Sequence, residues 1–254
     1  LDGVRLGEHG LPFVPFGFEI TPLVRPGAAH YLAVRVHEAD RLYGFAYNFQ
    51  GHWSGLYRDV ELTAAGPVRL EGLALYPDAE AGVLTVDAVL NGCTDAPLAL
   101  RVAVEGGPAA EFPVTGAEGR YTLEMPDPRR WSPDAPNLYR VDAALVQGDT
   151  VLDAQSERVG FVTLATAGKH ILINGDPYYL RGTGDFLSCP ETGCPDTDRD
   201  RWRRKLQTLR DYGYNYVRCQ SYVYGPEYYD AADEVGLLVQ SEMGMLGGWG
   251  GNTP

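Results

Sequence analysis

Residues 171–182, which read ILINGDPYYLRG, mark a change in the hydrophobic pattern of the chain. Before this segment, short stretches alternate between apolar and polar residues and are separated by glycine, proline and aspartate, which is typical of antiparallel β-structure. After Tyr179 the pattern becomes strand, helix, strand, as in parallel β/α units. The change predicts a β-sandwich region followed by the beginning of a (β/α) barrel. Barrel enzymes place their chemistry at the carboxyl ends of their strands.

The length and charge of the chain exclude several classes of protein. With 254 residues and 44% hydrophobic content, it is long enough for two or three modest domains with their own cores. The formal net charge of −13 argues against a nucleic-acid partner, because phosphate binding requires clustered lysine and arginine. No apolar run approaches the about 20 residues of a membrane span, so no membrane partner is expected.

The first residue, Leu1, is neither an initiator methionine nor part of a signal-like segment. We therefore expect the chain to be the interior of a longer protein. The compartment and the oligomeric state cannot be predicted from this sequence.

The histidines and cysteines predict no metal site and no cofactor. The five histidines are scattered, and the four cysteines include no C-x-x-C pair. Cys189 and Cys194 flank a short loop, in which they form either a disulfide, if the protein is exported, or two thiols. Both possibilities remain open at this point.

The first 166 residues predict two regions of β-sandwich. Residues 1–64 carry candidate strands at 31–36 and 57–62 and indicate part of a sandwich whose first strands are missing. Residues 65–166 show a cleaner period of two, and we expect an antiparallel sandwich of about 100 residues there. The apolar faces of its predicted strands are Leu84, Val86, Ala88 and Leu90; Leu98, Leu100, Val102 and Val104; and Tyr139, Val141, Ala143 and Leu145.

Residues 167–254 predict two β/α units and a third strand. Asp196 and Asp198 are candidate caps of the first helix, and Pro226 suits the first turn of the second. Three strands are fewer than the eight of a closed barrel, so we expect only its first part. The predicted elements are a strand at 178–181, a helix at 199–212, a strand at 215–219, a helix at 226–236 and a strand at 237–240.

Four motifs, in order, resemble those of glycoside hydrolase family 2, the family of β-galactosidases, β-glucuronidases and β-mannosidases. Residues 55–60, GLYRDV, resemble the end of its N-terminal sugar-binding jelly roll, and residues 131–139, WSPDAPNLY, are similar to a motif of its immunoglobulin-like middle domain. Residues 174–182 resemble the N-G-x-P and R-G entry to its catalytic barrel. Residues 213–218 and 233–239 resemble its second and third barrel strands.

The resemblance implies a multidomain fold. This fold comprises the C-terminal part of a jelly-roll β-sandwich at 1–64, an immunoglobulin-like β-sandwich at 65–166, and the truncated first part of a catalytic (β/α)8 TIM barrel at 167–254.

The resemblance also implies a retaining, exo-acting β-glycosidase that hydrolyses terminal β-linked sugars of an oligosaccharide or glycoside with two glutamates. In the family these glutamates follow the fourth and seventh barrel strands. We therefore expect them beyond Pro254 and expect the chain alone to be inactive. The alternative is a non-catalytic carbohydrate-binding or adhesion protein built of β-sandwich modules.

The resemblance assigns Arg218 to the arginine that orients the nucleophilic carboxylate, and the alternative is a structural ion pair. Departures from the family pattern leave the sugar undetermined, because Gly184, Phe186 and Ser221 stand where many members have Asn, His and His. Galactose specificity therefore has no support. The candidate substrate-binding residues are Asp185, Gln220, Ser221, Tyr222, Glu242 and Trp249.

Several candidates also have structural interpretations. Glu242 either lines the pocket or forms a structural pair, and Trp249 either stacks on a sugar or anchors a loop. The loop that contains residues 48–53 is a candidate pocket wall. Asp134, in the WSPDAPNLY motif, is expected to hold a turn.

Overall fold

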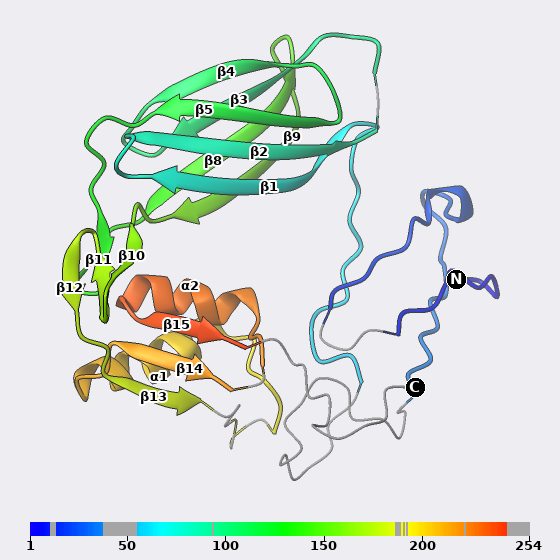
Figure 1. The fold of residues 1–254 in the computed structure, drawn as a ribbon. Helices are drawn as coiled ribbons and strands as arrows, with labels where there is room; N and C mark the ends of the chain where they lie inside the picture. Colours follow the sequence, from blue (N-terminus) through cyan, green and yellow to red (C-terminus); the bar gives the residue numbers. More distant parts are fainter. Residues whose placement is uncertain are drawn as a thin grey trace, which may run out of the picture.

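The computed structural model describes residues 1–10, 14–37, 55–92, 94–185, 189, 191, 193–220 and 222–242. Figure 1 shows a two-sheet sandwich above a smaller layer of parallel strands and helices, with a small antiparallel sheet beside them and an extended N-terminal segment at the other side. No helix among the described residues is long and apolar enough to cross a membrane.

The sandwich consists of two antiparallel sheets of three and four strands. The three faces predicted from the period of two are confirmed, because they lie in β2, β3 and β8 and point into one core that the two sheets enclose. The sheets, in spatial order, are β1 (Arg69–Asp78), β2 (Val83–Asn91) and β5 (Glu118–Glu124), and β4 (Ala109–Val114), β3 (Leu98–Val104), β8 (Tyr139–Gln147) and β9 (Thr150–Val159).

Short elements connect the sandwich to the β/α part. β6 (Trp131–Ser132) pairs with β7 (Ala135–Pro136), and β10 (Leu164–Ala167), β11 (His170–Ile173) and β12 (Asp176–Tyr178) form a three-stranded antiparallel sheet. Asn174 and Gly175 make the turn between β11 and β12 with φ angles of 53° and 90°, which suits an Asn-Gly hairpin turn.

The β/α part consists of three parallel strands and two helices. Asp198 caps α1 through its side chain, and Gly236 ends α2 in the left-handed conformation. Both predicted helices are confirmed. The elements in chain order are β13 (Gly182–Asp185), α1 (Arg199–Asp211), β14 (Tyr216–Cys219), α2 (Pro226–Val235) and β15 (Leu238–Ser241).

The first parallel strand does not lie at 178–181, as the sequence pattern predicts. Buried Asn215 accepts a hydrogen bond from the backbone N of Arg181 (2.7 Å) and donates one to the carbonyl of Tyr179 (2.9 Å). These bonds occupy the backbone groups before β13, so strand pairing begins at Gly182, opposite Tyr216.

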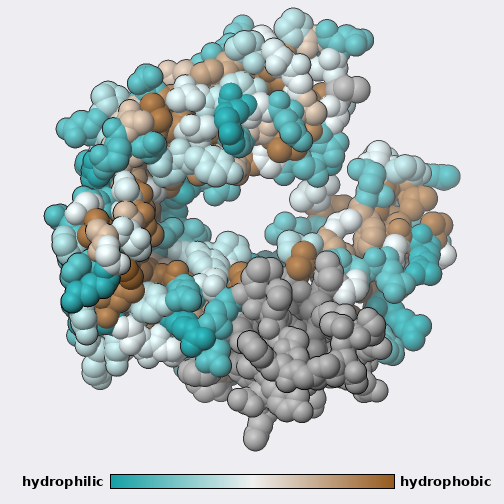
Figure 2. Space-filling model, viewed as in Figure 1, coloured by the Kyte–Doolittle hydropathy of each residue, from teal (hydrophilic) through white to brown (hydrophobic). Residues whose placement is uncertain are grey.

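The predicted strands at 31–36 and 57–62 are also wrong. Within residues 1–10, 14–37 and 55–67, the structure has one short 3-10 helix, η1 (Thr21–Leu23), and no strand. An alternating pattern makes one face apolar but does not supply a strand to pair with. Figure 2 shows hydrophobic surface on this segment. Its exposed large hydrophobic residues include Phe16, Leu32 and Val34.

The sandwich docks onto the helices through the WSPDAPNLY segment. The indole of Trp131, 5% exposed, donates to the carbonyl of Asp233 in α2 (2.9 Å). Arg210 of α1 donates to the carbonyl of Pro133 (2.7 Å), and the backbone at Gly236 lies directly against that carbonyl. Both helices therefore contact the sandwich through the same turn.

Asp134 does not hold this turn, contrary to the sequence prediction. The hydroxyl of Ser132 accepts the hydrogen bond from the backbone N of Ala135 (3.1 Å) instead. Asp134 is 82% exposed and contacts Arg210 at 3.2 Å, so it belongs to the junction between the sandwich and α1.

Two glycines test this docking. Gly236→Ala and Gly213→Ala both place a side chain at positive φ (74° and 87°), which costs about 1–2 kcal/mol. At Gly236 the new Cβ would also overlap the carbonyl of Pro133, whereas no heavy atom of the described residues lies within 4 Å at Gly213. In urea unfolding, we expect Gly236→Ala to lose roughly 1–3 kcal/mol more than Gly213→Ala. Equal losses would contradict the close approach.

Candidate functional site

The carboxyl ends of the three parallel strands meet at one edge of the sheet. Arg218 pairs in register with Gly184 of β13 and Gln240 of β15, and Cys219 pairs with Asp185 and Ser241. Because side chains alternate along a strand, these two sets point to opposite faces. Cys219 is buried on the helix side, and Arg218, with 50% of its side chain exposed, lies on the open side.

The open face has a shallow hollow of about 290 Å³. The ring of Tyr216 lies across Gly182, where a Cβ would overlap it, and its hydroxyl hydrogen-bonds to the side chain of Gln240. β13 adds little side-chain volume to the hollow, because two of its four residues are glycines. Its lining residues are Leu180, Gly182, Thr183, Gly184, Tyr216 and Arg218.

Arg218 and Glu242 form an ion pair in which the guanidinium Nε donates to the carboxylate. Glu242 follows β15 directly, and 24% of its side chain is exposed. The structure thus brings together two of the predicted site residues, at the ends of neighbouring strands. Such a charge-assisted bond fixes the direction in which the guanidinium presents its other N–H groups.

Asp185 lies on the opposite, helix side of the sheet. Its side chain is 5% exposed and accepts from the ammonium of Lys205 in α1 at 2.9 Å. The hydroxyl of Tyr228 lies 3.5 Å from the same oxygen. These partners offset the cost of burying the carboxylate, and the ion pair joins the end of β13 to α1.

Tyr222 lies in an aromatic cluster that covers the helix side of the sheet. It is 3% exposed and packs edge-to-face on Tyr224, which stacks on Tyr228. Burial is the main cause that raises the pKa of each of these phenols, so all three stay protonated. Burial likewise raises the pKa of the Cys219 thiol to about 11, which makes it a poor nucleophile.

Gln220 begins the connection from β14 to α2. Its backbone N donates to the carbonyl of Asp185 (2.9 Å), which extends the pairing of β13 and β14 by one residue. Ser221, Trp249 and the loop at 48–53 lie outside the described residues.

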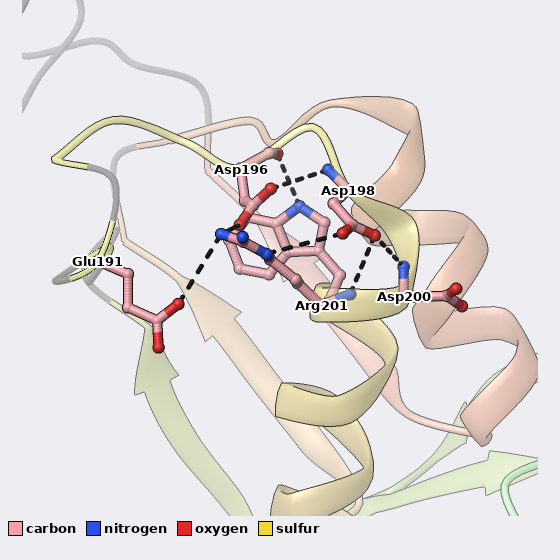
Figure 3. Close-up of polar contacts among 6 residues, drawn as sticks. Glu191, Asp196, Asp198, Asp200 and Arg201 are labelled. Atoms are coloured by element: carbon pink, nitrogen blue, oxygen red, sulfur yellow. Dashed lines mark hydrogen bonds and ion pairs between the residues drawn. The ribbon is translucent and has the colours of Figure 1, made fainter.

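An ion-pair network surrounds the start of α1. Arg201 lies between Glu191, Asp196 and Asp198 (3.8, 3.1 and 3.7 Å), as Figure 3 shows. Asp198 also accepts hydrogen bonds from the backbone N atoms of Asp200 and Arg201 at the start of the helix. These acidic residues are thus engaged in capping and pairing.

No group of three or more His, Cys, Asp or Glu side chains among the described residues could hold a metal ion. Cys189, Cys194 and Cys219 are present as thiols in this structure.

Sequence reasoning missed three residues that shape this edge of the sheet. Lys205 neutralises Asp185, and Arg58 pairs with Glu227 at the start of α2. Lys205 could have been found from the sequence, because it is a charged residue on the face of a predicted helix that is expected to be buried. The partners in the second pair are 169 positions apart, and no local pattern connects them.

Comparisons with known proteins match both parts of the chain. Residues 68–161 match the family model of glycosyl hydrolases family 2, and residues 164–249 match the model of the TIM barrel domain of that family. The crystal structure of a family 2 β-galacturonidase from Eisenbergiella tayi bound to glycerol superposes with a TM-score of 0.61 at 25% identity. That match covers 70% of this chain and 33% of the other.

Curated relatives are similar over nearly the whole chain. A putative β-glucuronidase of Formosa agariphila is 29% identical over 268 residues, covering 100% of this chain and 25% of that protein. A β-galactosidase of Klebsiella pneumoniae is 28% identical, covering 95% of this chain and 25% of that protein. The chain thus spans about a quarter of the length of these relatives. With a sandwich domain followed by the start of a TIM barrel domain, it belongs to glycosyl hydrolases family 2.

Proposed function

We propose that this chain is part of a longer, retaining, exo-acting β-glycosidase that hydrolyses terminal β-linked sugars. The observation that carries the proposal is Arg218, half-exposed at the carboxyl end of β14 and oriented by Glu242. Relatives named as β-glucuronidases and β-galactosidases support a carbohydrate substrate, and their greater length leaves room for the remainder of a catalytic barrel.

The proposal divides the chain into the end of a jelly-roll sandwich at 1–64, an immunoglobulin-like sandwich at 65–166 and the first part of the catalytic barrel at 167–254. The strand order of the sandwich supports the middle assignment. The chain crosses between the sheets after β2, β4 and β5, in a three-on-four arrangement of the Greek-key kind.

In the proposed reaction, one carboxylic acid protonates the glycosidic oxygen while a carboxylate about 5–5.5 Å away attacks the sugar carbon. We expect both glutamates beyond Pro254. The remaining N–H groups of Arg218 would donate to the nucleophilic carboxylate. They would keep this carboxylate ionised and fix its orientation. This role needs a guanidinium that points to the inside of the barrel, as the alternation along β14 supports.

The remaining candidates divide by the face on which they lie. Gln220, Ser221, Glu242 and Trp249 are proposed to line or border the sugar pocket from the strand ends. Asp185 and Tyr222 are buried on the helix side of the sheet. We propose that they act on the pocket indirectly, by fixing the positions of β13 and of the β14–α2 connection.

The first test is the rate of the full-length enzyme with Arg218→Ala. Because the guanidinium acts on the carboxylate that reacts, we expect kcat to fall by about 10²–10³ with the best substrate. Arg101→Ala removes an ion-paired arginine of similar exposure from the sandwich (43% against 50%). It is the matched control and should leave kcat unchanged.

The assay would use β-galactoside, β-glucuronide, β-mannoside and β-glucosaminide substrates, with folding checked by circular dichroism. A near-normal kcat in folded Arg218→Ala would contradict the assigned role and show that Arg218 acts only as a structural ion-pair residue. Full-length wild-type protein that binds these sugars but turns over none of them would favour the non-catalytic carbohydrate-binding alternative.

The second test uses the 254-residue chain alone. Without a proton donor and a nucleophile in place, no glycosyl-enzyme intermediate can form, and we expect the chain to be inert towards nitrophenyl β-glycosides. Turnover by pure chain above the buffer background would show that the catalytic carboxylates lie within it.

A further inference from the structure

An ion pair joins the N-terminal segment to the β/α part. Arg58, in the GLYRDV motif, donates through both terminal nitrogens to Glu227 in the first turn of α2, with Nη1 3.1 Å from Oε2. The side chains are 37% and 23% exposed, so the pair is partly shielded from water. Two parallel bonds between a guanidinium and a carboxylate fix both distance and orientation.

The backbone next to this pair leaves room for it. Gly225 precedes α2, and a Cβ there would overlap both Nη1 of Arg58 and the carboxylate of Glu227. Pro226 provides the first turn of the helix with a fixed φ angle. The positive end of the helix dipole favours the carboxylate of Glu227 at this position. The start of α2 is therefore shaped to receive the arginine.

A second contact lies beside the first. Burial raises the pKa of Tyr222 most, and the neighbouring Tyr57 raises it further, by charge interaction first and by hydrogen bonding second. Tyr57 and Arg58 thus reach two points of the same connection, at Tyr222 and at Glu227.

This connection leaves β14 directly after Arg218 and Cys219. At its start, the backbone N of Gln220 is bound to the carbonyl of Asp185. At its end, Glu227 is bound by Arg58. The connection is thus held at one end by the neighbouring strand and at the other end by a segment from a different part of the chain.

We propose that Arg58 is a positioning residue for the sugar pocket. Its ion pair with Glu227, which we call the clamp, fixes the end of the β14–α2 connection. The inference rests on the proposed function, because it assigns the clamped connection to the pocket wall. Releasing the clamp should weaken substrate binding more than it slows the chemical step, since Arg218 lies on the strand itself.

The test compares full-length wild-type enzyme with Arg58→Ala, Arg58→Lys and Glu227→Gln. Arg120→Ala is the matched control, because Arg120 makes a two-bond ion pair with Asp87 (2.7 and 2.6 Å) within the sandwich. We expect Arg58→Ala and Glu227→Gln to raise KM about tenfold with kcat within about twofold of wild type, and Arg58→Lys to be intermediate. Amide hydrogen exchange over residues 222–229 should be faster than in wild type in Arg58→Ala and Glu227→Gln, and unchanged in Arg120→Ala.

Unchanged exchange over residues 222–229 in Arg58→Ala would overturn the clamp. Faster exchange with an unchanged KM would overturn its role in positioning the pocket. Wild-type enzyme that hydrolyses none of the glycosides would reject the proposed function, and this inference with it. An active wild type whose Arg58→Ala variant matches Arg120→Ala in KM and exchange would reject this inference alone.

Discussion

Trp131 lies where three parts of the molecule meet, and the position of the strand ends depends on its hydrogen bonds. Its indole N–H binds the carbonyl of Asp233 in α2, and its own carbonyl accepts from the side chain of Asn174 (3.0 Å) in the β11–β12 turn. Removal of one partner from a buried hydrogen bond leaves the other unsatisfied, at about 1–3 kcal/mol. The indole therefore helps to fix how the sandwich and the β/α part fit together, beside the contacts of Arg210 and Gly236 with Pro133.

The parallel sheet of β13, β14 and β15 has a structural role on one face and a chemical role on the other. On the helix side, Val217 and Cys219 are fully buried, and the carboxylate of Asp185 forms an ion pair with Lys205. On the open side, Arg218 and Glu242 form an ion pair at the strand ends, beside a shallow hollow. A shift of one residue in register would exchange these faces, so the contacts that fix register also place the proposed site.

Local signals predicted the helices well and the long-range contacts poorly. The caps Asp198 and Gly236 lie in the sequence beside the helices they end, so both helices could be placed from residue type. The start of β13 was misplaced because the side chain of Asn215, far along the chain, binds the backbone there. Asp185 was expected in the pocket because its segment resembles a pocket-lining segment of the family, whereas the face on which it lies depends on register.

The most direct test of this account is amide hydrogen exchange of full-length Trp131→Phe beside Trp202→Phe. Both indoles are buried and donate to a backbone carbonyl, but Trp202 binds Asp196 within the β/α part (2.8 Å). The account predicts faster exchange in α2 and in β10 to β12 for Trp131→Phe. Trp202→Phe, whose ring packs on Tyr224 and Tyr228, should leave β10 to β12 unaltered. Unaltered exchange in α2 of Trp131→Phe would contradict the claim that this indole couples the sandwich to the strand ends.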